Sequence, residues 1–198
     1  MDSKKKMFIA IGIFAIVLLA AVIAVVAVLA AQQVSIKSQV DISYVADSHV
    51  IGSVSAKYET ENGTKKDLGS ITFEGGESNG TTNALSDIGD LKLESNSNDY
   101  VDFTFTFVNG SSIAKYTAVL AFIDGDNGKG NIDNMLVQGR ASSVNEFSNI
   151  VIDDYNHLTQ IEVPVSSTVI YVVRVSIDSP SKDATFEGTL LWDIVTER

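Results

Sequence analysis

Alternation of apolar and polar side chains at every second residue is the feature that most constrains this fold. Five such rows follow Gln32, and successive side chains of a strand point to opposite faces. Each row therefore predicts a strand with one buried face. No window after Gln32 has sustained helical spacing, so an all-β domain is expected over residues 32–198. The rows are Val34–Tyr44, Val50–Tyr58, Val101–Phe107, Val169–Val175 and Ala184–Ile194.

Turn signals separate these rows. Asn62-Gly63 and Asn109-Gly110 each divide two strand-like runs, and Asn-Gly readily takes the positive φ angles of a type I′ hairpin. The polar stretch between Glu74 and Asp90 is expected to be a long surface connection. Shorter apolar runs bring the total to about nine or ten strands. The expected fold is an antiparallel two-layer β-sandwich of jelly-roll or Greek-key type.

A long apolar segment precedes the alternating rows. Residues 7–31 carry no charge and follow Lys4, Lys5 and Lys6. As a helix this segment would span roughly 37 Å, more than the ~30 Å hydrocarbon core of a bilayer. Only a helix satisfies its backbone groups in lipid. The lysine cluster predicts that residues 1–6 stay in the cytoplasm and that residues 32–198 reach the outer side.

Two fates of this segment stay open. A retained signal anchor makes the protein a single-pass protein of the cell membrane, with an extracellular C-terminal domain. Cleavage near Ala31, after small residues, makes it a secreted protein. The apolar run is longer than the roughly 7–15 residues of a usual signal peptide, which favours the anchor. A type IV pilin leader would need a Gly or Ala just before the apolar run and a Glu within it, and neither is present.

The charge of the outer domain excludes one class of partner. Residues 1–31 contain three lysines and Asp2, so residues 32–198 keep 11 Lys/Arg against 24 Asp/Glu, a formal charge of −13. Such a domain repels phosphate backbones, and no nucleic-acid partner is expected. The chain has no cysteine, so disulfides and thiol chemistry are excluded and the hydrophobic core must supply the stability.

The sequence favours a non-catalytic protein without a cofactor. His49 and His157 are the only histidines, and neither belongs to a His-Glu-x-x-His zinc motif. No Gly-x-Ser-x-Gly nucleophile elbow occurs. Three Asn-Gly-Ser/Thr sequons, at Asn62, Asn79 and Asn109, are glycan acceptors in a secretory pathway that attaches glycans.

One stretch suits a calcium ion. Calcium takes six to eight oxygen ligands, and the loop from residue 124 to 133 is rich in Asp, Asn and Gly. EF-hand spacing is not met, because Gly128 and Lys129 occupy positions that need Asp/Asn and Gly. An ordinary inter-strand loop accounts for the same composition, and both interpretations stay open. The candidate ligands are Asp124, Asp126, Asn127, Asn131 and Asp133.

Two segments resemble the TasA/camelysin family of exported β-sandwich surface and matrix proteins. Leu91-Lys92-Leu93 followed by Tyr100–Ser112 is similar to a Phe-x-Phe strand and Asn turn of that family, and Asp183–Trp192 is similar to its last strand. The resemblance implies a surface or matrix protein that assembles into fibres. The longer N-terminal apolar run departs from the family pattern. Camelysin is associated with metalloprotease activity, for which this chain has no zinc motif.

The leading hypothesis is a structural or interaction protein of the cell envelope that associates with itself through its first strand. The apolar face of that strand consists of Val34, Ile36, Val40, Ile42 and Tyr44. Such a strand can pair within its own domain or extend a neighbour's sheet. Deleting residues 32–45 is expected to abolish self-association and to leave a folded remainder. The alternative is a monomeric, membrane-tethered module that binds a ligand or calcium.

Overall fold

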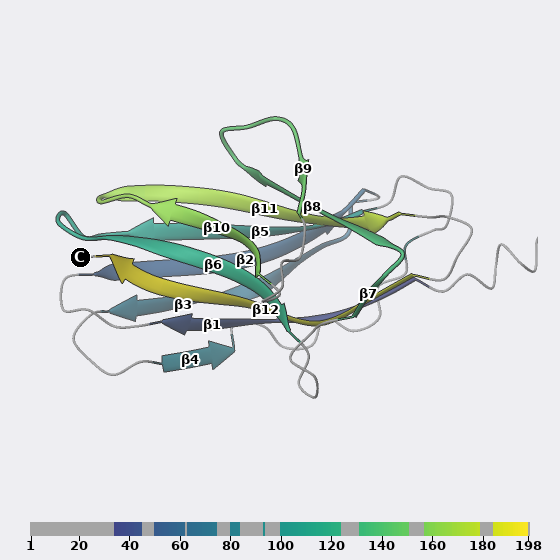
Figure 1. The fold of residues 1–198 in the computed structure, drawn as a ribbon, viewed down its shortest axis with the longest axis horizontal. Helices are drawn as coiled ribbons and strands as arrows, with labels where there is room; N and C mark the ends of the chain where they lie inside the picture. Colours follow the sequence, from purple (N-terminus) through teal and green to yellow (C-terminus); the bar gives the residue numbers. More distant parts are fainter. Residues whose placement is uncertain are drawn as a thin grey trace, which may run out of the picture. The chain divides into compact units, whose positions relative to one another are not determined.

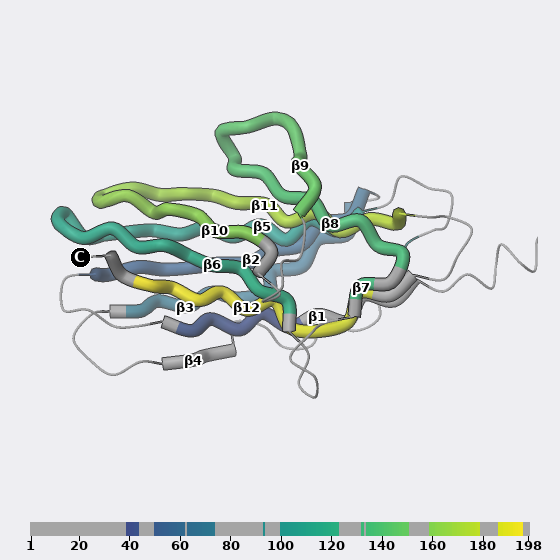
Figure 2. Tube along the Cα trace, in the orientation of Figure 1, coloured from purple at the N-terminus to yellow at the C-terminus, as the bar shows by residue number. Residues whose placement is uncertain are grey.

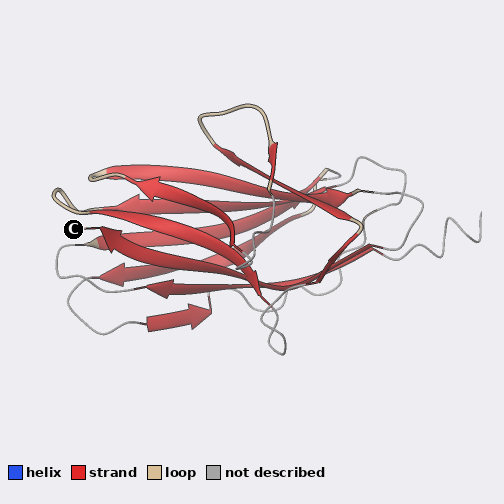
Figure 3. Ribbon diagram, viewed as in Figure 1, coloured by secondary structure: helices blue, strands red, loops and turns tan. Residues whose placement is uncertain are grey.

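A computed structural model describes residues 34–44, 50–61, 63–74, 80–83, 93, 100–123, 131–150, 157–178 and 184–197. Within these residues every regular element is a β-strand, and twelve strands form two sheets (Figures 1 and 3). Val34–Arg198 forms one compact unit. The predicted all-β sandwich is thus confirmed in its class, with more strands than the sequence suggested.

The first sheet has the strand order β10-β6-β12-β1-β4, and β7 pairs with the beginning of β12. The bounds are β10 (His157–Val163), β6 (Lys115–Ile123), β12 (Ala184–Glu197), β1 (Val34–Tyr44), β4 (Gly80–Asn83) and β7 (Asn131–Asp133). The second sheet has the order β3-β2-β5-β11-β8-β9. Its strands are β3 (Lys65–Glu74), β2 (Ile51–Thr60), β5 (Tyr100–Asn109), β11 (Ser167–Ile177), β8 (Met135–Ala141) and β9 (Ser148–Asn149).

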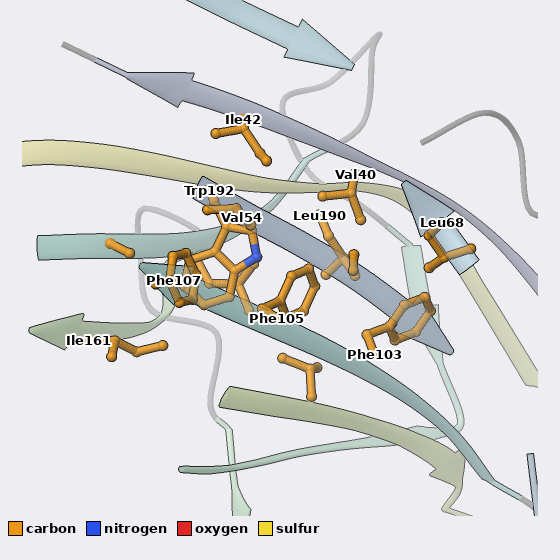
Figure 4. Packing of buried hydrophobic residues seen from close by; sticks show 14 of the residues in the cluster. Val40, Ile42, Val54, Leu68, Phe103, Phe105, Phe107, Ile161, Leu190 and Trp192 are labelled. Carbon is orange, nitrogen blue, oxygen red and sulfur yellow. The ribbon is translucent and has the colours of Figure 1, made fainter. Parts of the chain in front are cut away.

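Aromatic side chains from both sheets fill the space between them (Figure 4). The alternation on β5 places Phe103, Phe105 and Phe107 inward, and all three are fully buried. Phe105 and Phe107 meet the Trp192 ring of β12 edge-on, with centroids 5.0 and 4.8 Å apart. Each such pair contributes about 0.5–1.5 kcal/mol beyond its buried area. The aromatic rows are therefore core, as two-residue spacing predicts.

The pairing differs from the expected antiparallel sandwich at one point. β1 runs parallel to β12 over its whole length, from Val34 opposite Ala184 to Tyr44 opposite Ile194. The first and last strands of the unit are therefore direct neighbours that point the same way. Alternation within each strand is the same in parallel and antiparallel sheets, so it could not distinguish the two pairings.

The polar stretch after Glu74 also contains a strand, contrary to the expectation of an uninterrupted surface connection. β4 comprises Gly80, Thr81, Thr82 and Asn83, which pair with Tyr44 back to Asp41 of β1. No large apolar side chain marks these four residues. Their strand conformation depends on the backbone pairing with β1, and no periodic pattern in the sequence indicates it.

The two Asn-Gly turns were predicted as type I′ hairpins, and neither is one. The β2–β3 hairpin has a longer loop, closed by a hydrogen bond from the Thr60 amide to the Thr64 carbonyl, with Gly63 at a φ of 84°. This is the pattern of a three-residue loop with a left-handed glycine. Asn109-Gly110 ends β5 in one sheet and leads to β6 in the other. It is a crossing between the layers.

None of the described residues forms a helix that is long and apolar enough to cross a membrane. The predicted apolar segment at residues 7–31 lies outside the described part.

Candidate assembly strand and polar clusters

β1, the proposed assembly strand, contributes directly to the core. Its β-branched alternation favours an extended strand, and Val40 and Ile42 are fully buried. They lie opposite Leu190 and Trp192 of β12 (Figure 4). Val34, Ile36 and Tyr44 occupy strand positions of the same parity, opposite Ala184, Phe186 and Ile194.

The two edges of β1 are used unequally. One edge pairs with β12 along all eleven residues, whereas the other pairs with β4 only at Asp41–Tyr44. Among the described residues, no strand pairs with the outer edge of β1 from Val34 to Ser38. An unpaired row of backbone N–H and C=O groups is a template for another strand.

Burial of β1 changes the expected result of deleting residues 32–45. The deletion would remove Val40 and Ile42 from the core and uncover the edge of β12. Loss of two such side chains costs about 2–5 kcal/mol each, comparable with the stability of a whole domain. We therefore expect the truncated chain to lose its fold as well as its self-association.

The candidate calcium residues are only partly within the described part. Asp124, Asp126 and Asn127 lie outside it. Asn131 and Asp133 belong to β7, where their backbones pair with Glu187 and Thr185 of β12. The described residues contain no group of three or more His, Asp or Glu side chains that could hold a metal ion. His157 begins β10 opposite Ala121, and His49 lies outside the described residues.

A buried amide, whose sequence context suggested only a turn and a glycan acceptor, joins the two sheets. Asn109 is 2% exposed, and its Nδ2 donates to three backbone carbonyls, those of Ala114, Val163 and Pro164, at 2.8, 3.2 and 3.1 Å. Its Oδ1 accepts from the Ser111 amide at 2.9 Å. Every polar atom of this side chain is thus engaged, as burial requires.

The neighbouring serines extend this network. Ser111 Oγ accepts from the amides of Ile113 and Ala114, and the Ser111 carbonyl accepts from the Ser166 amide at 2.8 Å. The β5–β6 and β10–β11 connections are therefore tied together at one end of the sandwich (Figure 2). The sequon at Asn109 cannot accept a glycan in this fold, because its amide nitrogen is buried and occupied. Asn62 and Asn79 lie outside the described residues.

An arginine cluster lies on the outer face of the second sheet. Arg174 makes a two-pronged ion pair with Asp102 at 2.6 and 2.7 Å. Its guanidinium lies between the rings of Tyr100 and Phe147, at 3.6 and 4.2 Å. The ion pair with Asp102 is the main cause that raises the pKa of Arg174. Arginine suits this geometry because its planar head both forks onto a carboxylate and stacks on rings.

Arg140 also contacts the Phe147 ring of that cluster. Its guanidinium lies 4.8 Å from the Phe147 ring, and its Nη1 donates to the Val144 carbonyl at 2.9 Å. These contacts tie the β8–β9 connection, which contains Val144 and Phe147, to Arg140 of β8 and Arg174 of β11. Asp102, Arg174 and the two rings thus hold one another in place on the outer face of the sheet.

Two tyrosines between the sheets are held neutral. Burial raises the pKa of Tyr116 strongly, and its Oη has no hydrogen-bond partner within the described structure. Burial also raises the pKa of Tyr171, an effect that a hydrogen bond with Thr159 partly offsets. Desolvation disfavours the phenolate, so these groups are core residues and poor candidates for acid–base work.

No protein-family model matches the chain, and no curated protein matches its sequence.

Proposed function

We propose that this chain is a non-catalytic structural protein of the cell envelope whose outer β-sandwich assembles by exchanging β1 between copies. The observation that carries the proposal is the position of β1. It is the first strand of the unit, it pairs with β12 throughout, and it supplies the fully buried Val40 and Ile42. Exchange of an identical element between protomers is a low-cost route to assembly, because the same contacts form in a neighbour.

The proposal also includes a location. The apolar segment at residues 7–31 behind three lysines supports export, with the domain at the outer side of the membrane or released after cleavage. The resemblance to exported matrix proteins supports a fibre. We also propose a jelly-roll or Greek-key type of connection, for which the β5–β6 and β10–β11 crossings between the layers are the support.

A pair of cysteines tests the exchange directly. Gln39 on β1 lies opposite Thr189 on β12, and both positions are partly exposed. The chain has no other cysteine, and a disulfide between Gln39→Cys and Thr189→Cys forms only where β1 lies beside β12. If β1 is exchanged, mild oxidation of the full chain in detergent gives a ladder of covalent oligomers on a non-reducing gel.

The controls separate exchange from random contact. Chains with only one of the two cysteines should give no ladder, and mixing the two single variants should give dimers alone. If the double variant, at concentrations where the native chain sediments as oligomers, closes only an internal disulfide and stays monomeric, β1 remains in its own domain and the proposal fails.

A further inference from the structure

We propose that one end of the outer face of the second sheet is a self-docking surface, on which a second copy of this chain packs face to face. The proposal goes beyond strand exchange and does not depend on it. It rests on the distribution of charge over this face: the strand register places uncharged residues at one end and charged residues in the other half.

Four uncharged runs of sequence meet at this end of the sheet. Charged residues make up 20% of the whole chain, yet none occurs within four stretches of the described sequence. These stretches are 50–56 on β2, 68–73 on β3, 103–114 on β5 with its following connection, and 163–173 on β11 with its preceding turn.

The register aligns these runs into two cross-strand rows. Ser53 of β2 lies opposite Val108 of β5 and Thr72 of β3, and Val108 lies opposite Thr168 of β11. In the next row, Ser55 lies opposite Thr106 and Ser70, and Thr106 lies opposite Ile170. Residues paired across strands share a face, so all eight side chains project away from the core. With Ile51, they form what we call the neutral patch, which is bounded on β3 by Glu74, the cross-strand partner of Ile51.

The end of the patch is apolar. Six large apolar residues of the described part are exposed, and four of them lie here: Ile51, Val108, Ile113 and Val165. Backbone hydrogen bonds hold their segments together, from the Gly110 amide to the Ile51 carbonyl and from the Ser166 amide to the Ser111 carbonyl. Scattered exposed apolar residues need no explanation, but four on segments joined in this way suggest an interaction site.

The charge of the domain selects the occupant. Lys57, Glu59, Asp102 and Arg174 occupy the other half of the same outer face, and residues 32–198 carry a net charge of −13. Two copies therefore repel each other, and the repulsion is weakest where neutral surfaces meet. A basic partner would be drawn to the acidic remainder, whereas a flat face of short hydroxyl and aliphatic side chains complements itself at the ~10 Å spacing of packed sheets.

The size of the neutral patch predicts a weak contact. Four strands about 4.8 Å apart, taken from Ile51 to Ser55 at about 3.3 Å per residue, give an area of roughly 200–300 Å², which is smaller than the ~800 Å² per partner of a standard interface. Such a contact forms when copies are concentrated, as on one membrane or along one fibre. It is isologous, so equivalent residues on two copies approach each other across a two-fold axis.

A single cysteine in the neutral patch tests this contact in the full chain. Thr168 is exposed and lies beside Val108 at the β11 side of the patch, and the native chain has no cysteine. Thr168→Cys should form a disulfide-linked dimer under mild oxidation, increasingly so as added salt screens the repulsion. The matched control is Val195→Cys, an exposed valine on β12 in the other sheet, which should remain largely monomeric.

A second substitution establishes specificity. Adding Val108→Glu to Thr168→Cys places two like charges in the contact and should lower the dimer yield about tenfold, the effect of ~1.4 kcal/mol. An unchanged melting temperature, expected for an exposed position, shows that the fold is intact. Equal yields at positions 168 and 195, no dimer at position 168, dimers insensitive to Val108→Glu, or cross-links only to other proteins would each overturn the proposal. A ladder or its absence in the Gln39→Cys/Thr189→Cys chain leaves this result unchanged.

Discussion

Asn109 illustrates how one residue can serve a role that its sequence context conceals. In the sequence it belongs to an Asn-Gly pair and to a sequon, both of which suggest an exposed turn. In the fold it is buried and donates to three carbonyl groups, one at the end of β10 and two in the connections beside it. Alternation gives the reason, because Asn109 continues the inward parity of Phe103, Phe105 and Phe107. That parity was the available signal for a buried side chain.

Replacing Asn109 by Asp should be strongly destabilising. The carboxylate would face the carbonyls of Ala114, Val163 and Pro164 without a proton to donate. We expect a loss of about 3–5 kcal/mol in the free energy of unfolding at neutral pH, measured by urea denaturation. Asn149→Asp is the control, since this exposed side chain only accepts a hydrogen bond from Gln138. Comparable losses in the two variants would contradict the role given to Asn109.

Tyr116 should make the free energy of unfolding depend on pH in the alkaline range. Burial raises its pKa above that of the unfolded chain, so the folded state holds the proton more tightly. This contribution is complete below about pH 10, the unfolded value, and is lost as the pH rises towards the folded pKa. Tyr116→Phe removes both the titration and an unpartnered hydroxyl. Its unfolding free energy should fall less steeply above pH 10 than that of the native chain. Parallel pH profiles for the two proteins would refute this assignment.

At the scale of the elements, glycines allow close packing inside the second sheet. A methyl group on Gly52 of β2 would collide with the ring of Phe73 on β3, its cross-strand partner. Gly52→Ala should therefore cost about 1–3 kcal/mol through overpacking, measured as a lower denaturation midpoint. At Gly110 the nearest atom to the added carbon would be the Ile51 carbonyl oxygen, 3.4 Å away, so Gly110→Ala should be nearly neutral. A larger loss for Gly110→Ala than for Gly52→Ala would show that packing against Phe73 is not the determinant.

The sequence alone predicted the long strands and their buried faces, but it did not predict the short strands. Alternation predicted the inward positions of β2, β5 and β12, where Val54, Phe105 and Trp192 are buried. β4 escaped prediction because its conformation depends on pairing with β1, and β9 has only two residues. Turn residues indicate where a strand ends. They do not indicate where the next strand lies, because Asn-Gly occurs both in hairpins and in crossings between the sheets. The partner of the next strand is therefore decided by tertiary packing.

At the scale of the whole molecule, the candidate site was predictable in part. The apolar face of β1 could be read from the sequence, and Val40 and Ile42 are in the core. Its parallel partner could not, because β12 lies at the other end of the unit. The neutral patch has the same origin: four distant uncharged runs became one surface only when the strand order was known. Long-range pairing is the information that local patterns lack.

The parallel β1–β12 pair has a consequence for how the molecule is made. A ribosome releases β1 first and its partner last, so the first strand must wait until nearly the entire unit has been synthesised before its place exists. Pairing across such a distance along the chain is slow to form. During that delay β1 can pair equally well with β12 of a finished neighbouring copy. The local concentration of copies at the site of synthesis would then determine which of the two pairings forms.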